Sequence, residues 1–229
     1  MSNRVAYRFF AAHDEQIEVE LDFDARTHRI EVADDAVRPE WTRLEARRCP
    51  NCNLPDTEAY CPAAVNLAQF LPQFETHVSY EQAIVEVETP TRTIVSKTTF
   101  QHGMAALIGL VMATSGCPRT RFLRPMARTH LPFATEQETV FRALAAHLLG
   151  QYVATQKGDP VTLSLSALKD NYMELSKVNA SMADRIRTVI VRDAAVNAVI
   201  ILESFALIAP ENIDYGFEDI RELFVVEEA

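Results

Sequence analysis

The residues best suited to chemistry in this sequence are four cysteines, Cys49, Cys52, Cys61 and Cys117. Two residues separate Cys49 from Cys52, and this spacing lets both sulfurs reach one ion from a tight turn. Three of the four cysteines are followed by proline, which stiffens the turn after a ligand in zinc knuckles and in iron–sulfur proteins alike. We therefore expect the four sulfurs to meet at one metal site, although Cys117 lies far from the others along the chain.

Several kinds of site would use this spacing. A structural zinc ion and an iron–sulfur cluster both accept four thiolates. A redox-active dithiol remains open, as does simple burial of Cys61 and Cys117, because free cysteine is often a core residue. Histidine could replace a missing sulfur, and the candidates are His77, His102 and His130. We favour structural zinc, with the iron–sulfur cluster as the alternative.

A second group of chemically capable residues directly follows Cys117. Four arginines and a histidine fall close together without an acidic residue among them: Arg119, Arg121, Arg124, Arg128 and His130. The fork of an arginine matches carboxylate and phosphate groups, so this segment is a candidate site for a small anion. The alternative is a rigid surface loop whose arginines pair with carboxylates of nearby helices. Beside an iron–sulfur cluster, the same positive charge would raise the reduction potential.

The net charge limits the classes of partner. The chain has 229 residues, of which 32 are acidic and 22 basic, so its net charge is -10. This charge disfavours binding to nucleic acid and to anionic membranes. The N-terminus does not resemble a signal peptide, and the longest apolar run, residues 104–113, is shorter than the roughly 20 residues of a membrane helix. We expect a cytoplasmic protein with reduced thiols, whose partner is an unknown protein or a small anionic ligand.

The apolar pattern predicts the elements that position these residues. Alternation over 5–9, 17–23 and 30–32 predicts a meander of strands, and 84–87 and 93–100 predict a strand pair. Helical spacing follows over 62–74, 102–115, 135–154, 163–178 and 183–209. Thr135 and Glu138 form a capping-box pattern, while Gly116 and Pro210 are expected to end helices.

These elements predict an α+β fold. An N-terminal antiparallel β-meander and strand pair would pack with a C-terminal bundle of about four to five helices. We expect one compact domain over 1–229, with a subdivision into a mainly β part with one helix, 1–100, and a helical part, 101–229. Asp193 and Asn197 lie four residues apart among apolar neighbours, so we expect them to form hydrogen bonds between helices.

Three long stretches of the sequence resemble a bacterial family. They are CPNCNLPDTEAYCPAAVNLAQF, SYEQAIVEVETPTR and ATSGCPRTRFLRPMARTHLPFATEQET, and the likeness extends to residues 150–152 and 196–203. The chain is similar there to a proteobacterial family catalogued only as a domain of unknown function. The family has proline and an aromatic residue where this chain has Asn53 and Thr129, and neither departure removes a cysteine. The resemblance implies a bacterial protein and supplies no activity, cofactor or substrate.

The residues favour a non-enzymatic protein in which zinc pins the strands to the helices, acting as a regulatory or interaction module. The alternative is a redox or sensing protein with an iron–sulfur cluster and an anion-binding arginine loop. A hydrolase or transferase that uses the loop 119–130 ranks last, because the sequence has no recognisable nucleophile–base pair, phosphate loop or dinucleotide fingerprint. The sequence alone does not decide whether the chain is an enzyme.

Overall fold

The N-terminal part of the chain forms one antiparallel sheet. The computed structural model describes residues 3–11, 15–156 and 164–224. Its strands are β1 (Arg4–Phe10), β2 (Gln16–Asp22), β3 (Gln82–Thr89) and β4 (Arg92–Thr99). They lie in the order β2-β1-β3-β4, so two hairpins meet where β1 pairs with β3.

The expected meander is wrong in its third strand. Residues 30–32 do not form a strand, and Ile30 makes only an isolated bridge with Phe23. The N–H of Ile30 donates instead to the carbonyl of Thr114, at 3.2 Å. The free edge of β1 is taken by β3, with Tyr7 opposite Val87. A later segment of the chain therefore completes the sheet.

The two faces of the sheet differ in chemistry. Alternate residues of β1, β2 and β3 are buried, including Tyr7, Val19 and Val85, as the period of a strand requires. On the opposite face, Arg8 forms ion pairs with Glu18 and Glu86 at 2.7 Å each. One face is therefore part of the core and the other carries charged pairs across strands.

Seven helices accompany the sheet in the described part of the chain. They are α1 (Pro62–Ala68), α2 (Phe100–Thr114), α3 (Arg124–Arg128), α4 (Glu136–Thr155), α5 (Ser166–Arg187), α6 (Ala194–Tyr215) and α7 (Glu218–Arg221). Short 3-10 turns occur at η2 (Glu40–Thr42), η3 (Glu45–Arg47), η4 (Leu71–Phe74), η5 (Arg121–Leu123) and η6 (Glu222–Phe224). The predicted α+β class is confirmed, and six helices follow the sheet instead of four or five, because α3 and α7 are short additional helices.

Local signals place several helix ends correctly. Thr135 and Glu138 form the reciprocal capping box at the start of α4. Gly116 has φ +96° just after α2, a conformation that glycine adopts without steric cost. Pro62 stands at the first turn of α1, where its missing N–H leaves no hydrogen bond unmade.

Two other predicted helix ends are wrong. The expected helix over 183–209 is divided, because α5 ends at Arg187 and α6 begins at Ala194. Pro210 lies inside α6, which continues to Gly216 at φ +80°. The helix tolerates the lost proline N–H because Ala206 and Ala209 before the proline and Asn212 after it are buried and hold this part of α6 in place. Residue 163, the expected start of the preceding helix, lies outside the described residues.

Asp193 explains why the chain turns between α5 and α6. Its carboxylate accepts hydrogen bonds from the N–H and the hydroxyl of Ser79, both at 2.9 Å. Asn197 donates to the same carboxylate at 3.0 Å. Asp193 and Asn197 therefore interact with each other. The prediction of hydrogen bonds between helices is wrong, because the further partner of Asp193 is Ser79 in the loop before β3. This bond ties the start of α6 to the sheet.

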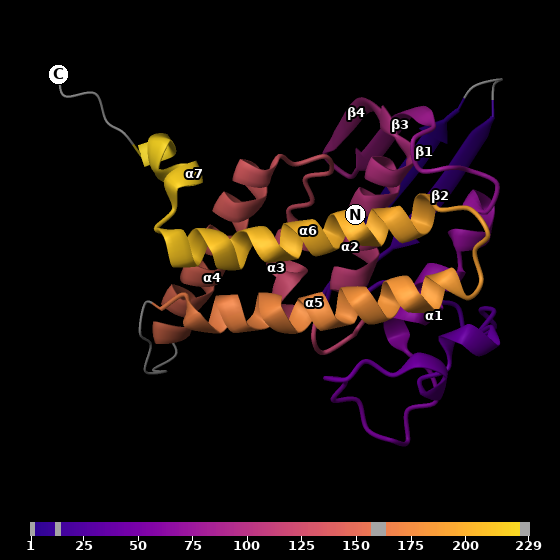
Figure 1. Cartoon of the computed structure of the whole chain (residues 1–229), viewed down its shortest axis with the longest axis horizontal. Coiled ribbons are helices and arrows are strands. Elements are labelled where there is room, and N and C mark those ends of the chain that lie inside the picture. The colour runs from indigo at the N-terminus through magenta and orange to yellow at the C-terminus, as the bar shows by residue number, and fades with distance from the viewer. Residues whose placement is uncertain (1–2, 12–14, 157–163, 225–229) are drawn as a thin grey trace.

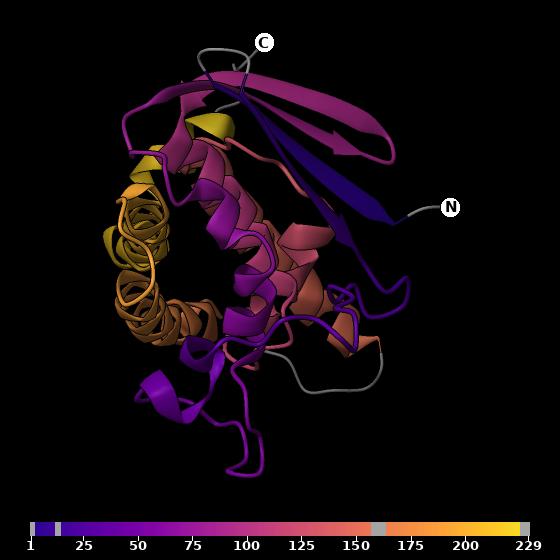
Figure 2. The same ribbon diagram turned by 90° about the vertical axis from the view of Figure 1, so that its right-hand side faces the viewer.

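The helices form layers beneath the sheet. Figure 1 shows α5 and α6 side by side along the long axis, with the sheet at one end, and Figure 2 shows α2 between the sheet and this helix pair. The main core includes residues from both halves of the chain, such as Phe9, Phe74, Met104 and Ile186.

One helix, α6, is long and apolar enough to cross a membrane by length and composition, with a mean hydropathy of 1.6. A core helix of a soluble protein meets the same criterion. Here α6 packs against α2 and α5, and Ala198 and Val199 are buried between them. These contacts account for part of its apolar composition, while Ile200 and Leu207 on the same helix remain exposed.

The approach of α2 to the sheet leads to a prediction about two glycines. A Cβ at Gly103 would lie 2.6 Å from a ring carbon of Phe9 and 2.9 Å from Val85, whereas a Cβ at Gly150 would have no neighbour within 4 Å. Gly103→Ala should lower the free energy of unfolding by about 1–3 kcal/mol through overpacking. Gly150→Ala should raise it by up to about 1 kcal/mol through helix propensity. Urea denaturation of both variants measures the difference, and equal effects would contradict the packing.

Candidate functional site

The CxxC pair lies in the long excursion between β2 and β3. The N–H of Cys52 donates to the carbonyl of Cys49 at 3.0 Å, so the two residues close one tight turn. Arg48 braces this turn, because its guanidinium donates to Asp56 and to the carbonyl of Leu54, both at 2.6 Å. Both cysteines are partly buried. The local sequence thus forms a knuckle, as its spacing predicted.

Cys61 is held at the start of α1. It is the N-cap residue of that helix, and its N–H donates to the carbonyl of Thr42 at 2.8 Å. Its side chain is buried, with 7% of its surface exposed. Asn66 on the same helix donates to the carbonyl of Ser115 at 3.4 Å. This bond joins α1 to the end of α2, where Cys117 follows.

Cys117 lies in the turn after α2. Its own N–H donates to the hydroxyl of Ser115 at 3.3 Å. Its sulfur accepts hydrogen bonds from the backbone N–H groups of Arg119 and Thr120, and these bonds lower the pKa of the thiol, while burial, the largest influence, raises it. Backbone N–H groups that point at a sulfur favour its thiolate form.

The structure places Cys117 within electrostatic range of Cys49 and Cys61. Burial raises the pKa of the Cys49 thiol, a hydrogen bond from Ser181 lowers it, and the nearby Cys61, Cys117 and Cys52 raise it further. Cys61 likewise raises the pKa of Cys117. Such mutual effects require the thiols to lie within electrostatic range of one another. Thiols from three separate segments thus lie within electrostatic range of Cys49, and we call these four residues the cysteine cluster.

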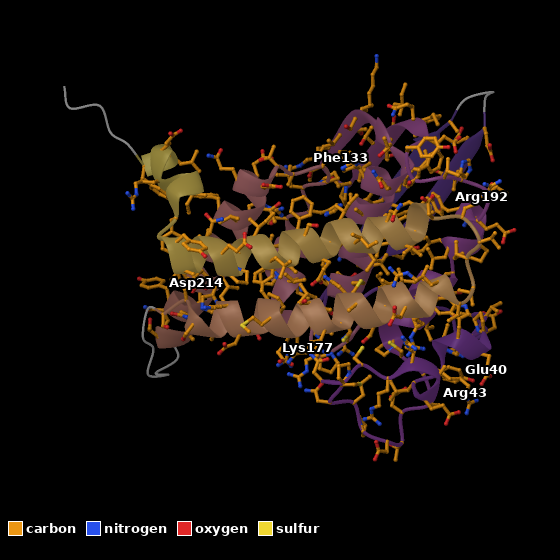
Figure 3. The ribbon with its side chains drawn as sticks, in the orientation of Figure 1. Glu40, Arg43, Phe133, Lys177, Arg192 and Asp214 are labelled. Atoms are coloured by element: carbon orange, nitrogen blue, oxygen red, sulfur yellow. The ribbon has the colours of Figure 1, made fainter. Side chains whose placement is uncertain are left out.

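The cluster lies against α5. Asn51, inside the knuckle, donates to the carbonyl and to the carboxylate of Glu174, both at 2.8 Å. Arg119 donates to the carbonyl of Asn51 at 2.7 Å and so links the turn after Cys117 to the knuckle. Figure 3 shows Lys177 on the side of α5 that faces this loop, and its amine bonds to Glu174. Glu174 and Ser181 mark the face of α5 that receives the cysteines.

A buried arginine lies at the centre of these contacts. Arg185 on α5 is 3% exposed, and its guanidinium donates to the carbonyls of Trp41, Arg43 and Arg47. Burial lowers the pKa of Arg185, and the cysteine thiols, first Cys61, oppose this effect. The guanidinium therefore holds the segment before the knuckle and places a positive charge beside the sulfurs.

No finished ligand sphere is present. Among residues 3–11, 15–156 and 164–224, no three His, Cys, Asp or Glu side chains are already placed to hold a metal ion. Each candidate histidine has another partner: Glu81 for His77, Thr99 for His102 and Tyr7 for His130. The donor set near the knuckle therefore consists of thiols, which suit zinc and iron–sulfur clusters.

The basic segment divides into two parts. Arg119 turns towards the knuckle, whereas the other arginines gather around Arg124. Burial and the neighbouring Arg29, Arg121 and Arg128 lower the pKa of Arg124. Its Nε is buried and has no hydrogen-bond partner among the described residues. The described charges that act on the pKa of Arg124 are thus all arginines, and we call Arg29, Arg121, Arg124 and Arg128 the arginine cluster.

His130 is separate from this arginine cluster. Its Nε2 is hydrogen-bonded to the hydroxyl of Tyr7 at 2.5 Å. Burial, with smaller effects from Arg142 and His28, lowers the pKa of His130 to about 3, so the ring is neutral at pH 7. A neutral imidazole adds no charge to an anion site.

A family model described as a domain of unknown function, DUF6901, matches residues 5–225. The chain belongs to this family. The match confirms the resemblance to a family of unknown function, while the bacterial origin stays a prediction. All four cysteines and the basic segment lie inside the DUF6901 match. No curated protein and no solved structure is similar to the chain.

Three residues of the site gave no signal in the sequence. Arg29 joins the arginine cluster from the segment after β2, and a Cβ on Gly116 would lie 3.6 Å from its guanidinium carbon. Arg185 and Ser181 approach the cysteines from the C-terminal part of α5. Only the three-dimensional arrangement shows these contacts, because they link positions that are distant in the sequence.

The buried guanidinium leads to a prediction. Arg185→Met keeps an apolar stem but leaves three carbonyls without their donor, so it should lower the free energy of unfolding by about 3 kcal/mol. Amide hydrogen exchange should become faster over residues 41–61. Arg187→Met is the matched control, because Arg187 is half-exposed and pairs only with Asp184 at 2.8 Å, and it should change stability by less than about 0.5 kcal/mol. Equal losses in both variants would contradict the bracing role of Arg185.

Proposed function

We propose that the chain binds one structural zinc ion through Cys49, Cys52, Cys61 and Cys117. The observation that supports this most strongly is that thiols from three separate segments influence one another electrostatically and also influence Arg185 on α5. Four thiolates are a common donor set of structural zinc sites. Rotation about χ1 moves each sulfur while its backbone anchor stays in place, so the cluster can close around an ion.

The surroundings of the sulfurs suit a metal-bound thiolate. Zinc and four thiolates carry a net charge of about -2, and the guanidinium groups of Arg48 and Arg185 lie beside the sulfurs. The N–H groups of Arg119 and Thr120 favour the thiolate of Cys117, and Ser181, whose hydroxyl donates to the carbonyl of Lys177, lies close enough to Cys49 to lower the pKa of its thiol. Such hydrogen bonds orient and stabilise metal ligands.

The same chemistry argues against a thiol redox centre. Reactive cysteines have a lowered pKa, because the thiolate is the nucleophile. Burial raises the pKa of both Cys49 and Cys117. These thiols would be poor nucleophiles near neutral pH, whereas a bound metal ion would displace their protons.

A zinc ion with four protein ligands has no open position for a substrate. We therefore infer a non-enzymatic role, in which the metal fixes the knuckle, α1 and the end of α2 on α5. The resulting surface would serve a regulatory or interaction module in the reducing cytoplasm of a bacterium.

The metal content of protein purified without oxygen tests this proposal. We expect about one zinc per chain and no colour. Cys117→Ser should lose most of the zinc and lower the free energy of unfolding by about 3 kcal/mol or more, because metal binding contributes to folding. Ser181→Ala, which removes a hydroxyl near Cys49 but no ligand, should keep the metal. Full zinc content in Cys117→Ser would exclude a four-cysteine site.

The spectrum separates zinc from the alternative metal centre. A brown protein with iron and sulfide, bleached by air, would replace zinc with an iron–sulfur cluster in a redox or sensing protein. Protein without either metal would refute both forms of the proposal.

The arginine cluster supports a second function, the binding of a small anion such as phosphate. Like charges packed together repel, and the buried Nε of Arg124 has no partner in the described part of the chain. An anion would relieve the repulsion and supply an acceptor, since arginine forks match phosphate oxygens. The nearby sulfurs of the knuckle are not needed for this binding.

Substitution of Arg124 tests the anion site through the sign of the change in the free energy of unfolding. Without phosphate, Arg124→Met should raise the free energy of unfolding by about 0.5–1 kcal/mol, because it removes an unpaired buried donor and its repulsion. With millimolar phosphate, the wild type should gain thermal stability and the variant should gain little. Arg38→Met, at an exposed arginine, is the control and should keep the phosphate response. An unchanged response in Arg124→Met would place phosphate elsewhere.

A further inference from the structure

A cavity of about 420 Å³ lies beneath the β4 side of the sheet. Its walls come from β4, α2, the segment from α3 to α4, α5 and α6. The volume falls within the roughly 300–1,000 Å³ of pockets that hold small molecules. Apolar side chains form most of the surface, including Leu110, Met126, Phe133, Leu202 and Phe205, and Phe133 is labelled in Figure 3. The cavity is separate from the cysteine cluster, because it is not lined by any of the four cysteines.

Arg142 places a positive charge in this apolar wall. Its Nη2 donates to the carbonyls of Met126 and Thr129, at 2.9 and 2.8 Å, which fixes the guanidinium at the end of α3. Burial lowers the pKa of Arg142, and Glu138 and Tyr172 oppose the shift. Arginine nevertheless stays protonated in proteins. Among the described residues no carboxylate forms an ion pair with Arg142, so its charge faces the cavity without a direct partner.

A buried amide also lines the cavity without a hydrogen bond. Asn179 on α5 is 2% exposed, and its Nδ2 has no partner among the described residues. A buried donor without an acceptor costs free energy. The phenol of Tyr172, about two helical turns before Asn179 on α5, lines the cavity near Arg142, and each influences the pKa of the other. Three donors thus line one largely apolar space.

The charges of the lining favour an acidic ligand. Among the described residues that line the cavity none is Asp or Glu, although the whole chain has a net charge of -10. His130, the histidine nearest Arg142, is neutral at pH 7. Arg142 is the one arginine or lysine in the part of the lining that the structure describes. A ligand with one negative group and an apolar body would match one cation, two neutral donors and aliphatic walls.

We propose that this cavity binds a small organic acid with an apolar chain, whose carboxylate accepts hydrogen bonds from Arg142 and Asn179. The chain of the acid lies between α2 and α6, along Leu110, Leu202 and Phe205. A neutral apolar molecule would leave the guanidinium without a counter-charge in a poorly solvated wall. Inorganic phosphate would leave the apolar walls uncovered, so the arginine cluster and this cavity select different ligands.

Calorimetric titration of the full chain with decanoate and with decanol tests the proposal. The two probes share an apolar chain and differ in the acidic group. The wild type should bind decanoate at least about tenfold more tightly, since a charge-assisted hydrogen bond contributes more than a neutral one. Arg142→Met should remove this preference and leave decanol binding unchanged. Ala106→Phe, which places a ring in the cavity, should abolish binding of both probes.

Two control variants and the comparison of the two probes test whether the preference for decanoate depends on the charge of Arg142. Arg92→Met, at an exposed hairpin arginine, should bind both probes as the wild type does. Arg142→Lys keeps the charge and should retain part of the preference. If Arg142→Met or Ala106→Phe fails to fold, the comparison of the two probes in the wild type still decides. Equal binding of decanoate and decanol, or no binding of either, would overturn the proposal.

The result is independent of the proposed zinc site. A metal-replete protein that fails to bind decanoate would refute the cavity ligand and leave the zinc proposal intact. A protein that binds decanoate through Arg142 but contains no metal would refute the zinc proposal and support the cavity ligand.

Discussion

The close approach of α2 to the sheet is the contact on which the rest of the architecture depends. At Gly103 the helix backbone lies so near Phe9 and Val85 that a single methyl group would not fit. This contact fixes the depth and the direction of the central helix. One end of α2 then delivers Cys117 to the knuckle, and one side of it forms a wall of the cavity. Two candidate sites of different chemistry therefore share one rigid support.

Electrostatics in this acidic chain is organised by arginines that are not paired with acids. Arg185 is surrounded by carbonyls and sulfurs, Arg124 by other arginines, and Arg142 by apolar walls. On the surface, in contrast, Arg8 has several carboxylate partners. A buried guanidinium without a carboxylate is costly, and each of the three lies where an anionic group would compensate it. The charge distribution thus points to thiolates, a small anion and an organic acid at three separate places.

The sequence predicted what depends on neighbours along the chain. Alternation and helical spacing located all four strands and the long helices, and the CxxC spacing predicted the knuckle. The strand order could not be read in this way, because β3 pairs with β1 through contacts across a long excursion. The prediction that Pro210 ends a helix was wrong for the same reason, because the tertiary packing of α6 outweighs the local effect of proline. The roles of Arg29 and Arg185 could not be predicted, because a single arginine in a sequence does not indicate which groups it will contact in the folded chain.

The position of the excursion between β2 and β3 has a consequence for how the molecule folds. The hairpins β1–β2 and β3–β4 need only local contacts, whereas the pairing of Ala6 with Glu88 must close a long loop that contains the knuckle and α1. Closing a long loop costs conformational entropy that local contacts do not offset. Pairings between strands that are distant in the sequence therefore form slowly. We expect the hairpins to form first and the junction of β1 and β3 last. Any ion that held Cys49, Cys52 and Cys61 together would shorten that loop and speed the slowest step of folding.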